Sequence, residues 1–169
     1  MSLVKVLNIL YNENMKVIES FLVNHLNLET GLYVSRKDQC DGVVTTTFDL
    51  RFTAPNKEAV LNCAGVHTLE HLGATFLRNS YLKDKIIYFG PMGCRTGFYL
   101  VMFGDLAPLD VYPIICEMLD FVINYEGDIP GATPIECGNF SDQNLEDAKL
   151  YAKKYLKELQ TFKHFEYKK

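Results

Sequence analysis

Two histidines, His67 and His71, stand four residues apart in the stretch VHTLEHLGATFLRN at positions 66–79. If this stretch is helical, both imidazoles leave one face of the helix on successive turns and can bind one metal ion. Glu70 lies between them, where its carboxylate can accept a proton from a group that the metal has acidified. Two histidines alone do not hold a catalytic metal, so the motif predicts a site only together with a third ligand.

A cysteine fits best as the third ligand. Cys137 lies in IECGNF, after a loop that contains Pro and Gly and directly before Gly138, where the backbone can approach a metal closely. Two histidines and one thiolate leave a fourth position open for water or substrate, and this ligand set suits zinc or iron(II). The residues themselves leave the choice of metal open.

A second cysteine has features of a proton-transfer group. Cys94 stands in the Gly-rich turn GPMGCRTG, with Arg95 beside it. A nearby cation favours the thiolate over the thiol, and a thiolate at neutral pH can serve as an acid or base. Cys94 is therefore a candidate for chemistry rather than for metal binding.

A helix and a framework must position these residues. The composition of 66–79 favours a helix, and Arg78 then lies on the histidine face, about 10 Å beyond His71. Period-two runs predict strands, and apolar residues three or four apart predict further helices. The expected order is strands at 31–36 and 43–52, the helix at 66–79, strands at 85–89 and 96–104, and helices at 110–125 and 144–159. This order predicts an α+β fold with a mainly antiparallel sheet packed against helices.

The strand expected at 43–52 has one apolar and one polar face. Alternate side chains point to opposite sides of a strand. The two sets are Phe48, Leu50 and Phe52 on one side, and Asp49, Arg51 and Thr53 on the other. The simplest interpretation is that Arg51 lies on a face exposed to solvent.

Length and composition fit one ordinary globular domain. The chain has 169 residues, 48% of them hydrophobic, and we expect the domain to span residues 15–169 after a flexible extension at 1–14. A net charge of -4 argues against nucleic acid and membrane surfaces as partners. The five cysteines form no C-x-x-C pair, which fits free thiols in a reducing cytoplasm.

Five blocks of this sequence resemble those of one known family. They are ESF followed by His25 at 19–25, FDLRFTAPN at 48–56, HTLEHLGATFLRN at 67–79, GPMGCRTGFYL at 90–100 and ECG at 136–138. Each block alone is weak, but all five occur in the order found in LuxS, the S-ribosylhomocysteine lyases. The similarity runs from about Val17 to the last helix.

The resemblance implies a metal-dependent enzyme that acts on a small molecule. Members of the family are cytoplasmic homodimers with active sites at the subunit interface. They bind a divalent metal that is natively iron(II) and replaceable by zinc or cobalt. The implied reaction cleaves S-ribosyl-L-homocysteine to L-homocysteine and 4,5-dihydroxy-2,3-pentanedione. It belongs to the activated methyl cycle, and the dione is the precursor of the quorum-sensing signal autoinducer-2.

The resemblance also implies roles for individual residues. It assigns the metal to His67, His71 and Cys137, and proton transfer to Glu70 and Cys94. The positions that line the substrate pocket are Ser20, His25, Arg51, Arg78, Tyr88 and Gly138. At Tyr88 this chain departs from better-known members, which carry an aspartate near the amino-acid end of the substrate. Recognition of the substrate amino group is therefore expected to differ.

Two other classes of protein are compatible with the same motif. The order H-x-x-E-H also occurs in inverted zinc peptidases, whose third ligand is a distal glutamate, and Glu146 is a formal candidate here. Alternatively, a non-catalytic protein can use such a site for binding or sensing. The presence of both Glu70 and Cys94 argues against that role, because a structural site needs neither.

Overall fold

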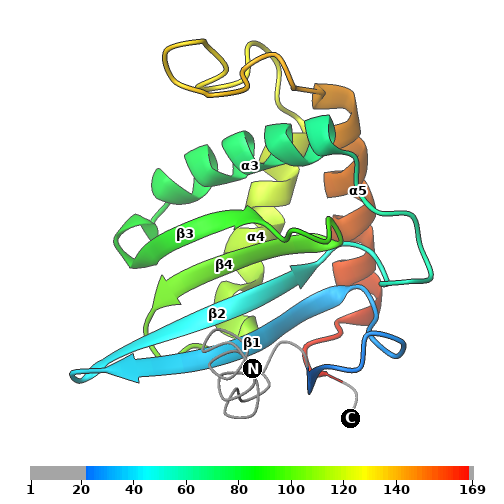
Figure 1. Ribbon diagram of the computed structural model, residues 1–169. Helices are drawn as coiled ribbons and strands as arrows, with labels where there is room; N and C mark the ends of the chain where they lie inside the picture. Colours follow the sequence, from blue (N-terminus) through cyan, green and yellow to red (C-terminus); the bar gives the residue numbers. More distant parts are fainter. Residues whose placement is uncertain (1–21, 168–169) are drawn as a thin grey trace, which may run out of the picture.

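The centre of the molecule is a four-stranded antiparallel sheet, which the computed structural model, describing residues 22–167, places beside three helices. The spatial order of the strands is β1-β2-β4-β3 (Figure 1). Their bounds are β1 Gly31–Cys40, β2 Val43–Arg51, β3 Ile86–Pro91 and β4 Gly97–Phe103. The four predicted strands are confirmed, and β1 extends beyond its predicted end because it stays paired with β2 as far as Cys40 and Val43.

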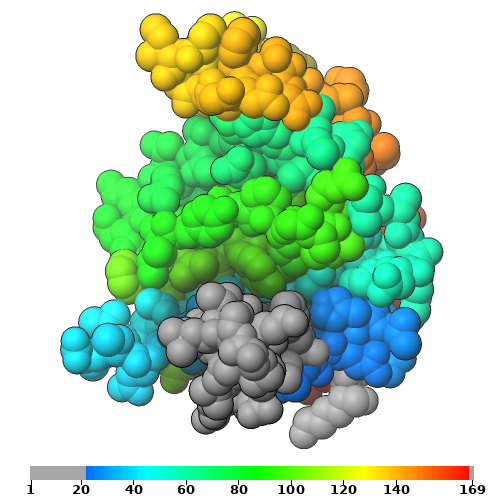
Figure 2. Space-filling view, viewed as in Figure 1, coloured from blue at the N-terminus to red at the C-terminus, as the bar shows by residue number. Residues whose placement is uncertain are grey.

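The helices are α3 (Cys63–Arg78), α4 (Pro108–Ile123) and α5 (Leu145–Phe162), and a short 3-10 helix, η1 (Lys83–Lys85), precedes β3. In Figure 1, α4 and α5 lie behind the sheet, while α3 runs beside the edge strand β3. The predicted α+β fold with a mainly antiparallel sheet is therefore confirmed. Between α4 and α5 the chain forms a loop, residues 124–144, which projects beyond α3 (Figure 2).

The helix α3 begins earlier than the sequence predicts. Its N-cap is Asn62, whose side chain accepts a hydrogen bond from Gly65 N at 2.7 Å. Gly65, which the sequence suggested as the point before the helix, is instead buried within its first turn. A Cβ at Gly65 would lie only 2.7 Å from the Tyr151 ring. Glycine is used here because α5 passes so close, and local helix propensity does not record this contact.

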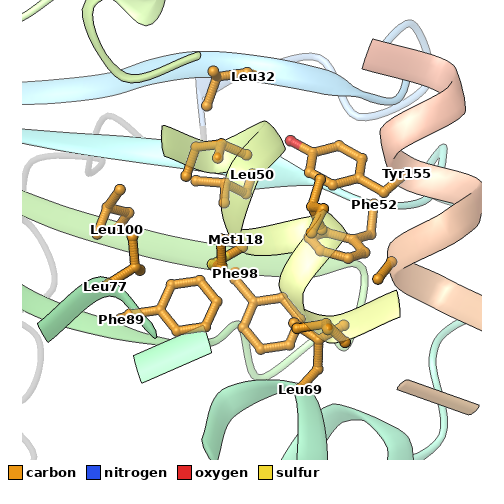
Figure 3. Packing of buried hydrophobic residues seen from close by; sticks show 14 of the residues in the cluster. Leu32, Leu50, Phe52, Leu69, Leu77, Phe89, Phe98, Leu100, Met118 and Tyr155 are labelled. Carbon is orange, nitrogen blue, oxygen red and sulfur yellow. The ribbon is translucent and has the colours of Figure 1, made fainter. Parts of the chain in front are cut away.

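The apolar face of β2 joins the sheet to the helices. Phe52 stacks on Tyr155 of α5 with ring centroids 4.0 Å apart, and Phe98 of β4 stacks on Phe89 at 5.1 Å (Figure 3). Leu69 of α3 is completely buried in the same cluster. This packing fixes α3 against the sheet edge and thereby fixes the direction in which its polar face points.

The polar face of β2 is buried, so the interpretation of Arg51 as an exposed arginine is wrong. Asp49 is 2% exposed and Arg51 3% exposed, and Arg51 Nη2 donates to Asp49 Oδ2 at 2.6 Å. Tyr167, near the C-terminal end of the described chain, donates to the same carboxylate oxygen at 2.9 Å and stacks on Tyr33. A segment far away in sequence thus covers this face.

Some predictions concern residues that the structure does not describe. The expected extension at 1–14 and the candidate Ser20 lie outside residues 22–167 and stay predictions. Within those residues, no helix is long and apolar enough to cross a membrane.

Candidate metal and proton-transfer site

The loop 124–144 lies across α3 from the sheet (Figure 1), and it contacts both histidines of this helix. The two rings lie edge to face with centroids 4.7 Å apart. His67 Nδ1 lies 2.9 Å from Asp142 O, and His71 Nδ1 lies 2.6 Å from Pro130 O. The loop therefore holds the outer nitrogen of each imidazole with a backbone carbonyl.

These carbonyls determine where the imidazoles carry their protons. A carbonyl oxygen only accepts hydrogen bonds, so an Nδ1 that bonds to one carries the hydrogen, and a neutral ring in that tautomer has its lone pair on Nε2. His67 Nδ1 also lies 3.2 Å from Gln143 Nε2. The two Nε2 atoms are only 3.1 Å apart. Two facing lone pairs with no hydrogen between them repel each other. A cation between them removes the repulsion, so this arrangement fits a metal ion.

Cys137 supplies a third donor atom at the same point. Its Sγ lies 3.4 Å from His67 Nε2, and the donor atoms of His67, His71 and Cys137 all lie within 4.8 Å of one another. A tetrahedral zinc site has donor separations of about 3.3 Å for two nitrogens and about 3.6 Å for nitrogen and sulfur. Asn139 N–H donates to the Cys137 sulfur at 3.4 Å, which fixes the position of the sulfur beside His67. The three residues therefore fit a metal with an open fourth position.

Gly131 is a residue of this site that sequence reasoning missed. Its φ is +72°, and a Cβ there would lie 3.3 Å from His71 Nδ1. Glycine allows the backbone to turn at this point and lets the Pro130 carbonyl approach the imidazole. The Pro and Gly content predicted a loop, but which carbonyl turns toward a histidine has no signature in the sequence.

Glu70 and Glu146 have different relations to this group. Glu70 is half-buried on α3 and directly precedes the ligand residue His71. Glu146 is exposed in the first turn of α5, and it is not part of the metal-binding group found among residues 22–167. The structure therefore does not support Glu146 as the third ligand of a peptidase.

Cys94 lies in a second polar cluster, at the turn between β3 and β4. Its Sγ is 3.1 Å from Thr96 Oγ1 and 4.0 Å from Arg51 Nη1, while Arg51 Nη1 also donates to Thr96 Oγ1 at 2.5 Å. Burial raises the pKa of the Cys94 thiol, but hydrogen bonds with Thr96 and the charge of Arg51 lower it by more. The pKa of Cys94 therefore lies below its ordinary value, as a base at neutral pH requires.

The cation that favours the Cys94 thiolate is not the one that the sequence suggested. Arg95 follows Cys94 directly, but its Nη1 donates to Cys63 Sγ at 3.5 Å. Arg51, forty-three residues away, takes the expected place because β2 pairs with β4 and brings the two residues together. The predicted effect is present, but the pairing of strands decides which arginine produces it.

Two of the predicted substrate-lining residues meet in a small cavity over the polar face of β2. The cavity has a volume of about 20 Å³ and includes His25 and Arg51 in its lining. Arg51 Nε and Asp49 Oδ1 have no hydrogen-bond partner among the described residues, and both residues line this space. Unpartnered polar atoms beside a cavity mark a place for a water molecule or a hydroxyl group of a ligand.

The other three described candidates lie on the surface. Arg78 is exposed and its Nη2 donates to Ile87 O at 2.8 Å, which ties the end of α3 to β3. Tyr88 follows Ile87 and is 49% exposed. Gly138 is exposed, and a Cβ there would meet nothing within 4 Å. Within one chain no steric reason requires glycine at 138. The substrate roles of Arg78, Tyr88 and Gly138 stay predictions.

Fold and site together define a class of protein, and comparison with known sequences defines the family. An α+β domain with a two-histidine, one-cysteine centre, a flanking carboxylate and an activated thiol is a metalloenzyme suited to proton transfer. The family model of S-ribosylhomocysteinase (LuxS) matches residues 18–166. The chain therefore belongs to the LuxS family.

Individual relatives agree over most of the chain. The chain is 57% identical to the S-ribosylhomocysteine lyase of Finegoldia magna over 149 residues, which cover 88% of this chain and 95% of that protein. It is 54% identical to the lyase of the same name from Clostridium acetobutylicum over 142 residues, with 83% and 90% covered. With the Borreliella burgdorferi protein of that name the identity is 47% over 150 residues, with 88% and 96% covered.

Proposed function

We propose that this protein is an S-ribosylhomocysteine lyase, which cleaves S-ribosyl-L-homocysteine to L-homocysteine and 4,5-dihydroxy-2,3-pentanedione. The observation that carries this function is the convergence of His67, His71 and Cys137 at one point, in a chain of the LuxS family. The dione is the precursor of autoinducer-2, and the reaction recycles a product of the activated methyl cycle. The inverted zinc peptidase has no support from the relatives or from the place of Glu146.

The bond to be broken sets the chemical requirement. The thioether sulfur is attached to carbon 5 of the ribose, and with the carbonyl at carbon 1 the hydrogen on carbon 4 is not acidic. Moving the carbonyl to carbon 3 in two steps makes that hydrogen acidic, because it is then adjacent to the carbonyl. Loss of this proton expels the homocysteine thiolate from carbon 5 by β-elimination. The enzyme must therefore move protons between neighbouring carbons before it breaks the bond.

Cys94 and Glu70 are the groups that we assign to these transfers. The Cys94 thiolate takes the proton from carbon 2 and returns it to carbon 1, and the next shift moves a proton from carbon 3 to carbon 2 in the same way. Glu70, beside the metal ligands, moves protons on the substrate oxygens and in the final elimination. Arg51 holds Cys94 in its thiolate form between transfers, as the contact at 4.0 Å indicates.

The metal that we propose is iron(II), with zinc or cobalt able to replace it. When bound, such an ion supplies Lewis-acid chemistry, which makes hydrogens next to the substrate carbonyl more acidic. His67, His71 and Cys137 hold it, and the carbonyls of Pro130 and Asp142 keep the histidine rings in place. All five cysteines are free, which supports a cytoplasmic location where iron(II) and thiols stay reduced.

We propose that the active protein is a homodimer. Cys94 contacts Arg51 and Thr96, and among the described residues it has no contact with His67, His71 or Cys137. A second copy of the chain can bring its Cys94 cluster to the metal ligands of the first. Exposed apolar side chains beside Cys137, with Ile135 97% exposed, support this docking surface.

Mixing two inactive variants tests the shared site. Cys94→Ala and His71→Ala should each be inactive as pure proteins. If each site uses Cys94 of one protomer and His71 of the other, a mixed dimer has one doubly altered site and one intact site, so coexpression should restore turnover. The control is a hybrid dimer of one chain that carries both substitutions and one unaltered chain. It shows that chains with these substitutions still form dimers. Isolated hybrid dimers without activity would show that each site belongs to one chain.

Arg78 is expected to bind the carboxylate at the homocysteine end of the substrate. Arg78→Ala should raise KM by about tenfold or more with a smaller effect on kcat, since the lost contact is the same in the ground and transition states. Tyr88→Phe should change little, because a phenol carries no negative charge at neutral pH to bind the substrate ammonium group. Arg36→Ala, at an exposed arginine of β1, is the matched control. An unchanged KM in Arg78→Ala would mean that the homocysteine end lies elsewhere.

The direct test of the function is incubation of the metal-loaded protein with S-ribosylhomocysteine and a thiol-detecting reagent. A lyase releases homocysteine, whose thiol the reagent reports, and the dione is identified by derivatisation. A peptidase would instead hydrolyse an unstructured protein substrate and release no thiol. A metal-binding protein without catalytic function would bind the ion and turn over neither substrate. Either of the last two results would overturn the proposal.

A further inference from the structure

Thr68 connects the helix of the metal ligands to the far end of the loop that carries Cys137. This threonine is completely buried and directly follows His67. Its hydroxyl donates to Gln143 Oε1 at 2.7 Å and accepts from Asn144 N–H at 2.8 Å. Asn144 is also the N-cap of α5, so the contact lies where the loop becomes helix. Both hydrogen-bonding directions of this hydroxyl are thus used by the loop.

The same end of the loop orients the metal ligands. Asp142, next to Gln143, provides the carbonyl that lies 2.9 Å from His67 Nδ1. From there a short turn leads back to the thiolate, since Asp142 N donates to Asn139 O at 3.1 Å and Asn139 N donates to Cys137 Sγ at 3.4 Å. A displacement of residues 142–144 from α3 would therefore move both the carbonyl that holds His67 and the sulfur ligand.

We propose that Thr68 is a positioning residue for the metal, one that fixes the Cys137 loop on α3 so that the ion meets a preformed set of three ligands. The inference rests on the metal centre of the proposed function. A loop that runs from the end of α4 at Ile123 to the start of α5 at Leu145 loses much conformational entropy when it is ordered. Hydrogen bonds to the buried Thr68 hydroxyl order part of the loop before the metal binds. Metal binding then loses less conformational entropy, which raises the affinity for the metal.

Another threonine of α3 provides a matched control. Thr75 Oγ1 donates to His71 O at 2.7 Å, within its own helix. This bond follows the usual pattern of a threonine in a helix and makes no connection to the loop. Replacing either threonine with valine removes one hydroxyl at nearly constant volume. Only the change at Thr68 removes a contact between helix and loop.

The experiment measures zinc affinity by competition with a chromophoric chelator, without substrate. Thr68→Val should bind zinc about 10–100-fold more weakly than the unaltered protein, the range known for partners that orient metal ligands. Thr68→Ser, which retains the hydroxyl, should restore most of the affinity, and Thr75→Val should stay close to the unaltered protein. In metal-free protein, iodoacetamide should alkylate Cys137 faster in Thr68→Val than in Thr75→Val, as peptide mapping would show.

The design separates this inference from the proposed function. Unchanged affinity in Thr68→Val, or an equal loss in Thr75→Val, would overturn the positioning role even if the protein is a lyase. Zinc binding that depends on Thr68 in a protein without lyase activity would overturn only the proposed function. If Thr68→Val does not fold, Gln143→Leu removes the acceptor of the same hydroxyl from the loop side, together with the 3.2 Å contact of Gln143 Nε2 with His67 Nδ1. It should therefore lower zinc affinity by at least the same factor, and unchanged affinity in Gln143→Leu would also overturn the positioning role.

Discussion

The variant Cys94→Ala is expected to retain its metal and to lose turnover by about 10²–10⁴-fold, the contribution typical of a positioned proton-transfer group. The thiol contacts Thr96 and Arg51, and it does not belong to the metal-binding group found among residues 22–167. The substitution should therefore leave metal binding unaffected and remove only the group that accepts the proton. The loss should appear in kcat and in kcat/KM alike, because the contact acts in the transition state.

The measurement combines metal content by elemental analysis with homocysteine release under saturating substrate. Cys40→Ala, at an exposed cysteine at the end of β1, is the control and should be fully active. Because the pKa of Cys94 lies below its ordinary value, iodoacetamide should inactivate the enzyme at a pH below the ordinary pKa of a cysteine thiol, and equally so in Cys40→Ala. A Cys94→Ala variant with near-normal turnover would exclude this residue from the mechanism.

Glu70→Gln belongs to the same prediction, since it removes the second transfer group at constant size. The carboxylate flanks His71 on α3 but is not one of the three donors that converge, so the variant should purify with its metal and turn over at least about 100-fold more slowly. Loss of metal in Glu70→Gln would instead make Glu70 a ligand. Normal turnover would leave Cys94 as the only base of the site.

The second large effect is expected at Cys137. The variant Cys137→Ala should remain folded and purify nearly free of metal. Its affinity for zinc should fall by more than the about 10–100-fold that follows loss of a residue that merely orients a ligand. The sulfur is one of three donors that converge within residues 22–167, and two histidines leave the ion without sufficient ligands. Cys137 belongs to the projecting loop and not to the hydrophobic core, so the fold does not depend on it.

Metal content per chain and far-ultraviolet circular dichroism measure the two parts of this prediction. Cys63→Ala is a suitable control, because Cys63 is exposed at the start of α3 and its sulfur contacts Arg95. A full equivalent of metal in Cys137→Ala, together with loss of metal in Glu146→Ala, would favour the peptidase arrangement. Loss of the folded spectrum in Cys137→Ala would show that the loop contributes to stability as well.

The sequence by itself determined the features that depend only on residues close to one another in the chain. Period-two alternation predicted the strands, and the spacing of His67 and His71 placed two imidazoles on one face of a helix. Both follow from the geometry of a single element, so no tertiary contact is needed to read them. The sequence surroundings of Cys137 and Cys94 marked both as candidates, and the blocks shared with a known family added Arg51 as a site residue, although the three lie on different elements.

Only the tertiary structure decided which groups surround these residues. Arg51 is buried on a face where Tyr167 lies against Asp49, and it reaches Cys94 because β2 pairs with β4. Helix α3 starts at Cys63 with Asn62 as its N-cap, and Gly65 in its first turn lets α5 approach, a contact between segments far apart in the chain. The histidines are oriented by backbone carbonyls, and every residue has a carbonyl, so no side-chain pattern marks the two that are used. Residue types set the available chemistry, whereas long-range packing sets the distances at which it operates.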